Sequence, residues 1–301
     1  MLTELYIILV ELGLFAFGAT LIWFFVFRRL KKEAELSRDP FTAELARIPG
    51  HAASEKASAL REKAYETLLG LIAGIAGFIG YLFGAYMKAP SQTVLTGMLT
   101  VTIIGAVIVV SIRLRKPLRE ARRWQLGADG ERHTAQAIQS LAAYGCEFFH
   151  DLAFKDASGR VFNIDHVVLA PWGVLVIETK ARRKAKDQKG PESAKVKFDG
   201  AALRFPGFYD TAALDQVRAN TRFLAKKLLD RTGEKVTCVP LISLPGWYVE
   251  TLTANSEVIV CNPLQLWKHL AHRGDPVLDA AQRRRIGGYL NELATVAEPS
   301  T

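Results

Sequence analysis

The sequence predicts an α/β domain, built on a mixed sheet flanked by helices and preceded by three transmembrane helices. Half of its 301 residues are hydrophobic, and the long apolar runs are concentrated in the N-terminal third. Residues 160–180 contain two apolar stretches on either side of a Pro-Trp-Gly turn, which is typical of a β-hairpin. From residue 124 onward the expected order is helix, three strands, helix and strand, which favours a mixed sheet with helices on its faces.

Three apolar runs are candidate membrane spans, at residues 5–27, 68–87 and 94–112. Each is near the ~20 residues that a helix needs to cross a bilayer. The first run is too long for a signal peptide, follows no basic segment and lacks a small-residue cleavage pattern, so we interpret it as a retained anchor. The chain then divides into a membrane region (1–112), a basic juxtamembrane linker (113–123) and a cytoplasmic domain (124–301) with its core at 124–243.

The formal net charge of +9 comes in part from two basic clusters, Arg28–Lys32 after the first span and Arg113–Arg123 after the third. The positive-inside rule places both clusters in the cytoplasm. Three spans satisfy that rule if the N-terminus lies outside and everything after Ile112 lies inside. We therefore expect a multi-pass protein of the inner (cytoplasmic) membrane, with the lipid bilayer as one partner.

The second span is rich in glycine, with GxxxG pairs at Gly70/Gly74 and Gly80/Gly84. Such pairs allow helices to approach closely in lipid. Two alternatives stay open, packing against the other spans of the same chain, which we favour slightly, and a homodimer seam. In the first span, Glu11 is either protonated or directed toward the outer interface, or it has a functional role, because a carboxylate within a membrane is costly.

A helix is expected from Gly127, with Asp129 as its N-cap. One face of this helix carries Glu131 together with Ala135, Ile138 and Ala142. A carboxylate on a core-facing stripe needs either a cation or the partial positive charge of a helix N-terminus. Glu131 is therefore either a first-turn residue that serves the helix dipole or a third acidic group of a site.

The central hairpin pairs strands 161–169 and 174–180. If it closes symmetrically on Pro171 and Trp172, Asp165 lies opposite Glu178, and Lys180 shares the face of Glu178 because strand side chains alternate. Facing carboxylates repel each other, and a hard divalent ion such as Mg²⁺ would relieve that repulsion. This pattern predicts a metal site with a lysine beside it, and places the structural residue His166 on the opposite face.

The remaining elements follow from local patterns. Strands are expected at 147–154, 235–244 and 257–261, and Asp199-Gly200 predicts a hairpin turn between 195–198 and 201–205. Residues 211–230 form a helix whose core positions are Leu214, Val217, Leu224 and Leu228. Two short helices, at 263–272 and 279–293, close the domain. The three cysteines are far apart, match no zinc spacing and fit a reducing compartment.

Three short motifs together resemble a known family. They are Gly127-x-x-Gly130-Glu131, Ile164-Asp165-His166, and the segment Gly173-Val174-x-Val176-Ile177-Glu178-Thr179-Lys180. Asp165 followed by Glu178-Thr179-Lys180 resembles the D…(D/E)-x-K core of the PD-(D/E)XK nuclease superfamily. The whole set looks like the nuclease-related domain, NERD, over roughly Trp124 to Ser243, which is under half of the chain.

That resemblance implies a restriction-endonuclease-like fold and hydrolysis of phosphodiester bonds with Mg²⁺ or Mn²⁺, as an endo- or exonuclease. It implies that Asp165, Glu178 and Glu131 hold the metal and that Lys180 acts in catalysis beside Glu178 and Asp165. Related nucleases often carry a glutamine on the following helix, which makes Gln216 a candidate positioning residue. Here Asp210-Thr211 stands where Asn-Pro often precedes this glutamine, which is a departure from the family pattern.

A basic run follows the hairpin, and it includes Arg182, Arg183, Lys184 and Lys186. It is either a solvated loop or the surface that holds a nucleic-acid backbone, most readily DNA. The sequence thus favours a membrane-anchored nuclease over a non-catalytic, membrane-tethered module that binds nucleic acid or protein. A transporter is disfavoured, because the three spans carry a single ionisable residue.

Overall fold

The computed structural model of the chain describes residues 18, 25, 26, 28, 29, 46–88, 92–156, 158–184, 190–270 and 277–295. The chain divides into two compact units. Met1–Thr42 and Lys56–Arg123 form the helical unit, whereas Ala43–Glu55 and Trp124–Thr301 form the α/β unit. The predicted first span, residues 5–27 with Glu11, lies almost entirely outside the described residues.

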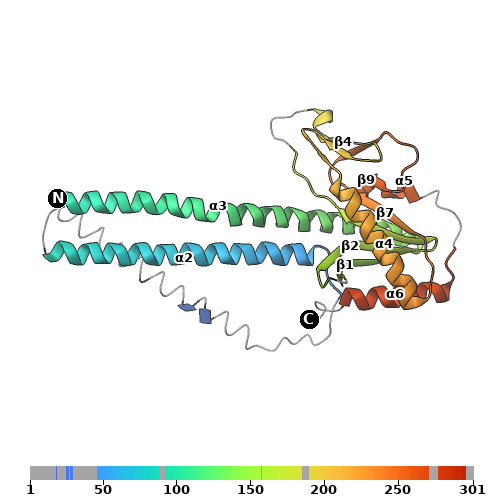
Figure 1. Cartoon of the computed structure of the whole chain (residues 1–301), viewed down its shortest axis with the longest axis horizontal. Coiled ribbons are helices and arrows are strands. Elements are labelled where there is room, and N and C mark those ends of the chain that lie inside the picture. Colours follow the sequence, from blue (N-terminus) through green and yellow to red (C-terminus); the bar gives the residue numbers. More distant parts are fainter. Residues whose placement is uncertain are drawn as a thin grey trace. The chain divides into compact units, whose positions relative to one another are not determined.

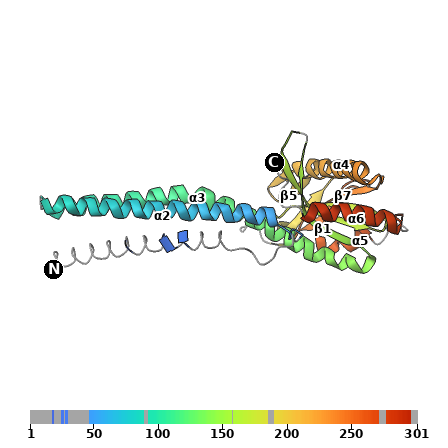
Figure 2. The same cartoon turned by 90° about the horizontal axis from the view of Figure 1, so that it is seen from below.

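Two long helices supply the described part of the helical unit: α2 (His51–Lys88) and α3 (Gln92–Ile138). Within this unit they run side by side, with Ala57, Ala64 and Ala121 buried (Figures 1 and 2). By length and composition both are capable of crossing a membrane. The apolar window of α3 buries none of its residues, and Val101 is 71% exposed. The predicted spans 68–87 and 94–112 fall within these two helices; a third span is not confirmed.

The basic segment 113–123, predicted as a juxtamembrane linker, is helical and lies within α3. Helix α3 continues through Pro117 and past Gly127, so Asp129 is an interior residue and the prediction that it is an N-cap is wrong. Arginine and lysine are good helix formers, and the segment therefore extends the apolar helix without a break. Asp129 instead accepts hydrogen bonds within the helix from Gln125 and Arg132, each at 2.9 Å.

The glycines of α2 face open space in the part of the chain that the structure describes. A Cβ atom added at Gly70, Gly74, Gly77 or Gly80 would meet no other atom within 4 Å. The described part of α3 therefore does not pack closely against this stripe; the predicted first span, the other partner in the favoured alternative, lies outside the described residues.

The α/β unit is built on a five-stranded mixed sheet with the order β1-β2-β3-β7-β9. The first three strands are antiparallel, whereas β7 and β9 continue the sheet in parallel. The strands are β1 (Glu147–Lys155), β2 (Val161–Ala170), β3 (Gly173–Thr179), β7 (Cys238–Ser243) and β9 (Ile259–Cys261). All five were predicted, each within a few residues of its observed ends.

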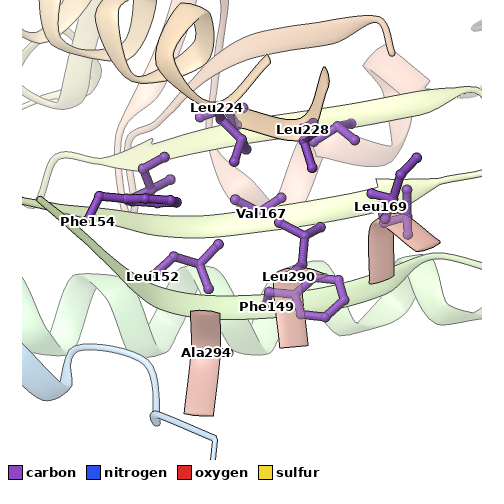
Figure 3. Close-up of a cluster of buried hydrophobic side chains, with 13 residues drawn as sticks. Phe149, Leu152, Phe154, Val167, Leu169, Leu224, Leu228, Leu290 and Ala294 are labelled. Carbon is purple, nitrogen blue, oxygen red and sulfur yellow. The ribbon is translucent and has the colours of Figure 1, made fainter. Parts of the chain in front are cut away.

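Helices cover both faces of this sheet. One face packs against α4 (Ala212–Thr232) and α6 (Ala280–Thr295), and Figure 3 shows Leu224, Leu228 and Leu290 meeting side chains of β1 and β2. The other face packs against the end of α3, the 3₁₀ helix η1 (Gln139–Tyr144) and the short helix α5 (Leu266–Leu270) after η3 (Pro263–Gln265). The four core positions predicted for α4 are all fully buried: Leu214, Val217, Leu224 and Leu228.

A second sheet was only half predicted. Its order is β6-β5-β4-β8, and the hairpin of β4 (Lys195–Phe198) and β5 (Leu203–Phe205) follows from the Asp199-Gly200 turn. Another 3₁₀ helix, η2 (Pro191–Ala194), precedes β4. The sequence did not predict β6 (Phe208–Asp210) or β8 (Tyr248–Thr251), which are too short to show a periodic pattern. This sheet packs against the first turns of α4.

The end of α3 departs from the predicted stripe. Ala135 and Ile138 are buried as expected, but Ala142 is exposed and Leu141 is buried in its place. The cause is the change from α-helix to the 3₁₀ helix η1, because the 3₁₀ helix has about three residues per turn and shifts the buried face by one position.

Candidate active site

The register of the central hairpin is the one that the sequence predicts. Val167 pairs with Val176 and Leu169 with Val174, and the recorded pairing ends at His166 and Ile177. Asp165 and Glu178 are the next residues in this register, at the point where the ladder stops. The site therefore begins at the open end of the β2–β3 hairpin.

Simple alternation fails at this point, in β1 as well as in β2. Phe149 and Leu152 of β1 belong to the same core, as do Ile164 and Val167 of β2, although each pair is three residues apart. The pairing of β1 with β2 omits Asp151, which has a φ of 52°. A left-handed conformation is uncommon for a residue other than glycine, and the alternation of both strands changes phase at the position of Asp151.

The side chain of Asp165 accepts a backbone hydrogen bond at the end of β3, where a strand carbonyl would normally be the acceptor. Its Oδ2 accepts a hydrogen bond from the backbone N–H of Thr179 at 2.7 Å. Burial, followed by the charges of Glu178 and Glu131, raises the pKa of Asp165 well above its usual range. The carboxyl group is thus fixed beside the end of β3 and is electrostatically coupled to two other acids.

Glu178 and Lys180 are joined directly. The Nζ atom of Lys180 donates to Oε1 of Glu178 at 2.7 Å and to Oε1 of Gln216 at 2.8 Å. Glu178 is buried, and burial raises its pKa against the opposing effect of the lysine charge. Gln216 lies in the first turns of α4, so its predicted place near the site is a contact with Lys180.

Glu131 reaches the same acids from α3. Burial, then the charges of Asp151 and Glu178, raises the pKa of Glu131 to about 7, and the backbone N–H of Gly50 donates a hydrogen bond to it. The close approach of α3 depends on Gly130, because a Cβ atom there would lie 2.6 Å from Cβ of Ala181. Since Glu131 is interior to α3, it does not serve the N-terminal dipole of that helix.

Two further residues of the site were not predicted. Asp151 is buried and accepts hydrogen bonds from Ala52 N–H at 3.1 Å and from Asn163. Its charge raises the pKa of Glu131. Asn220 is buried and its Nδ2 lies 3.4 Å from Oε2 of Glu178. The spacing of Gln216 and Asn220, one turn apart on α4, could have identified the second; the place of Asp151 depends on a β1–β2 register that the sequence does not reveal.

The chemistry of these groups suits a hard cation. Among the residues that the structure describes, no three His, Cys, Asp or Glu side chains enclose a ready-made metal site. Mg²⁺ needs less than that, because it keeps several waters and is usually held by one or two carboxylates and a substrate phosphate. Two coupled, oxygen-only donors, Asp165 and Glu178, meet this requirement.

In the basic run, one arginine forms an ion pair within the domain, and the next two residues are exposed. Arg182 Nη2 lies 3.0 Å from Oδ2 of Asp210, so Arg182 and Asp210 form an ion pair. Arg183 and Lys184 are exposed, and the Lys184 ammonium lies 5.6 Å from the ring centroid of Trp247. Lys186 lies outside the described residues.

His166 is a buried core residue. Its Nδ1 lies 2.9 Å from Nδ1 of His150, its partner across β1 and β2. Burial lowers the pKa of both imidazoles, and for His166 the proximity of His150 lowers it further. The pair thus favours the neutral state within the sheet.

Comparison with known proteins finds a family match within the α/β unit. Residues 126–245 match the family described as the nuclease-related domain, NERD. No curated protein and no solved structure matches the chain. The matched segment runs from the last turns of α3 past the end of β7, and contains Glu131, Asp165, Glu178, Lys180 and Gln216. Residues 126–245 of this chain are therefore a nuclease-related domain.

Proposed function

We propose that the chain is a membrane-anchored, metal-dependent nuclease that hydrolyses phosphodiester bonds of nucleic acid. The observation that carries this proposal is the gathering of three coupled acids, Glu131, Asp165 and Glu178, around one end of a hairpin, with Lys180 bonded to Glu178. Acids whose pKa is raised by burial and by the charge of a neighbouring acid are typical of functional centres. Their location in a nuclease-related domain gives them a reaction class.

In this proposal Asp165 and Glu178 hold Mg²⁺ or Mn²⁺, with Glu131 as a further ligand or as the acceptor of a ligand's hydrogen bond. Such an ion polarises the phosphate and lowers the pKa of a bound water. Thr179 N–H keeps Asp165 in place for this task, and the Asn220 amide lies beside the second oxygen of Glu178.

Lys180 either donates a hydrogen bond to the phosphate oxygens as negative charge develops on them, or orients the attacking water. A preorganised ammonium is most effective where water is largely excluded, and the Lys180 side chain is only 16% exposed. Gln216 accepts a hydrogen bond from Lys180 Nζ and so holds the ammonium in position. Arg183 and Lys184, with Lys186 further along the run, would hold the flanking phosphates, while Arg182 is anchored by Asp210.

The helical unit supplies the membrane anchor in this proposal. The exposed apolar surface of α3 suits a lipid environment better than water, where such a surface would be unstable. The C-terminal domain would then act in the cytoplasm, with DNA as the polyanionic partner. The open glycine stripe of α2 would be available to a second copy of the chain within the bilayer.

The experiment that tests this proposal uses the full chain in detergent, with Mg²⁺ or EDTA, against single- and double-stranded DNA and RNA. The wild type should cleave only with the divalent ion, and Asp165→Asn and Glu178→Gln should each abolish cleavage while the protein remains folded. Asp215→Asn is the matched control, since this α4 carboxylate is 80% exposed and pairs with Arg218. If Mg²⁺ neither shifts the melting temperature nor supports cleavage by the wild type, the catalytic assignment is wrong and the domain is a binding module.

A further inference from the structure

A cavity of about 400 Å³ lies between the start of β2 and the exposed side of α4. Its volume is within the range of roughly 300–1,000 Å³ that is usual for ligand sites. The residues that matter for its chemistry are Arg160, Phe162, Asn163, Gln216, Asn220 and Phe223. None of them was assigned to this cavity by the sequence.

Two residues that line the cavity also contact residues of the candidate active site. Gln216 accepts a hydrogen bond from Lys180 Nζ at 2.8 Å, and Asn220 lies 3.4 Å from Glu178. A molecule in the cavity would therefore be separated from Lys180 and Glu178 only by the side chains of Gln216 and Asn220. A ligand that occupies both places must have one part suited to carboxylates and a cation, and another suited to the cavity.

The apolar wall of the cavity consists of two phenylalanine rings in fixed orientations. Phe223 meets Phe162 edge to face, with centroids 5.0 Å apart and planes at 78°. Phe162 also stacks on Phe154 at 5.8 Å, and Phe154 belongs to the main core. Rings that are held by the core lose little freedom when a flat ligand stacks against them, and aromatic side chains are the usual platform for nucleobases.

The polar wall supplies groups that a base edge and its sugar-phosphate can use. Asn163 and Gln216 present amides, which both donate and accept hydrogen bonds. Arg160 adds a guanidinium that is 77% exposed and paired with Asp156 at 3.2 Å. Fixed rings, amides and a guanidinium within one cavity match the composition of a nucleotide.

We propose that this cavity receives one unpaired nucleobase of a nucleic-acid strand whose neighbouring phosphodiester lies at Glu178 and Lys180. The inference rests on the proposed nuclease function and deepens it by naming the substrate class. A base inside a duplex is stacked and paired, so it reaches the cavity only after unstacking, which is unfavourable. The domain therefore prefers single strands or frayed ends to blunt duplexes.

The test uses the full chain in detergent with Ca²⁺, which takes oxygen ligands as Mg²⁺ does. The probes are short single-stranded DNA oligonucleotides in which one nucleotide at a time is abasic. The wild type should lose affinity by a factor of about 5–150 when the missing base is the one beside the bound phosphate, and much less at other positions. The blunt duplex of the same sequence should bind more weakly than the intact single strand.

Two variants locate the effect in the cavity. Phe162→Leu keeps the apolar character but removes the ring, and Ala219→Phe fills the cavity from the exposed side of α4 without removing any core contact. Each should lower affinity for the intact strand and abolish the dependence on the abasic position. Tyr209→Leu is the control, because this ring is 71% exposed on β6 and lies outside the cavity; its abasic profile should equal that of the wild type.

The outcomes separate the two proposals. If the wild type binds or cuts nucleic acid but the abasic profile is flat, or if Ala219→Phe leaves the profile unchanged, the cavity does not hold a base and the nuclease proposal stands. If no nucleic acid is bound or cleaved under any of these conditions, the nuclease proposal fails, and this inference fails with it.

Discussion

The ammonium of Lys180 lies 2.7 Å from Oε1 of Glu178, and the two side chains are only 16% and 4% exposed. This ion pair supplies one positive charge to a site in which the charge of Glu178 raises the pKa of both Asp165 and Glu131. Lysine therefore stabilises the acids in part, and a divalent ion would complete that neutralisation. The site therefore has two states. Without the ion, Lys180 alone neutralises the charge of Glu178; with the ion, the metal shares that role.

Lys180→Met should lower the melting temperature more than most substitutions, because removing one partner of a buried pair costs on the order of 3–5 kcal/mol. Mg²⁺ should restore more stability to this variant than to the wild type, since the ion then has no competitor at Glu178. Cleavage should stay absent even at saturating Mg²⁺. Thermal melts with and without Mg²⁺ measure both effects.

Lys195→Met is the control for this comparison, because Lys195 lies in β4 of the second sheet and pairs with Glu192 and Glu250, which are both more exposed than Glu178. It should leave the melting temperature and its response to Mg²⁺ nearly unchanged. A Lys180→Met protein that melts and responds to Mg²⁺ as the wild type does would show that the ion pair is not part of the site.

Glu131 gives the site a pH dependence whose sign can be worked out. Its pKa rises from 4.5 to about 7 on folding, so between these values the folded chain binds more protons than the unfolded chain. The free energy of unfolding contributed by Glu131 therefore falls as the pH rises from about 4.5 to about 7, by roughly 3 kcal/mol in total. Above pH 7 that loss is complete.

The difference between wild type and Glu131→Gln reports this contribution together with the accompanying change at Asp165, whose pKa the charge of Glu131 raises. More distant titrating groups, such as the His150–His166 pair, are common to both proteins. In EDTA the wild type should gain stability relative to the variant as the pH falls from about 7 to about 4.5. Melting curves across this range measure the difference. A constant difference would mean that Glu131 does not titrate near neutrality.

The sequence predicted the parts of this site that depend on local pattern. Alternating apolar residues and a Pro-Trp-Gly turn define a hairpin register, which is why the observed pairs, such as Val167 with Val176, match the prediction. The two-residue spacing of Glu178, in β3, and Lys180, just after its end, likewise brings those side chains together. Both inferences need only the chain within one hairpin.

The rest depends on contacts that no local pattern encodes. Asp151 interrupts the alternation through its positive φ, and its role arises from an N–H group of Ala52, which is 99 positions earlier in the chain. Gly50 and Ala52 lie between the predicted spans 5–27 and 68–87, in what the sequence predicts as the membrane region (1–112), yet Ala43–Glu55 is part of the α/β unit. Likewise, the apolar pattern gave no reason for α3 to continue from the membrane region into the site.

The basic run should show unequal contributions to nucleic-acid binding. Arg183→Ser and Lys184→Ser should each reduce the dependence of log affinity on log salt by roughly one unit, the value expected for each lost phosphate contact. Arg182→Ser should instead lower stability, because Asp210, only 14% exposed, loses its partner. Salt titrations of binding, together with melting curves, separate the two effects, and equal salt slopes for all variants would identify the run as a solvated loop.

Membrane topology is a separate prediction that follows from the basic clusters. Reporter fusions after Thr301 should be active in the cytoplasm, and fusions at Ser91 should be active outside. The reason is that Arg113–Arg123 follows the apolar part of α3 and is retained on the cytoplasmic side. A reporter at Thr301 that is active outside would end the nuclease proposal, because the domain would not meet intracellular nucleic acid.

Gly50 connects the start of α2 to the acids, and its replacement should be more harmful than that of a comparable glycine. It has a φ of +73°, and a Cβ atom would lie 2.8 Å from the carbonyl oxygen of Ala128. Gly207 has a φ of +89° but no atom within 4 Å of such a Cβ. Gly207→Ala therefore measures the cost of the left-handed backbone alone, about 1 kcal/mol, and Gly50→Ala measures that cost together with the clash.

We expect Gly50→Ala to destabilise the chain by more than Gly207→Ala, and to raise the pKa of Glu131 further, because a displaced Gly50 N–H no longer stabilises the charged carboxylate. The pH range over which wild type and Glu131→Gln diverge should then move upward in the Gly50→Ala background. Equal destabilisation by the two glycine variants, with an unchanged pH range, would mean that this segment does not contribute to the electrostatics of the site.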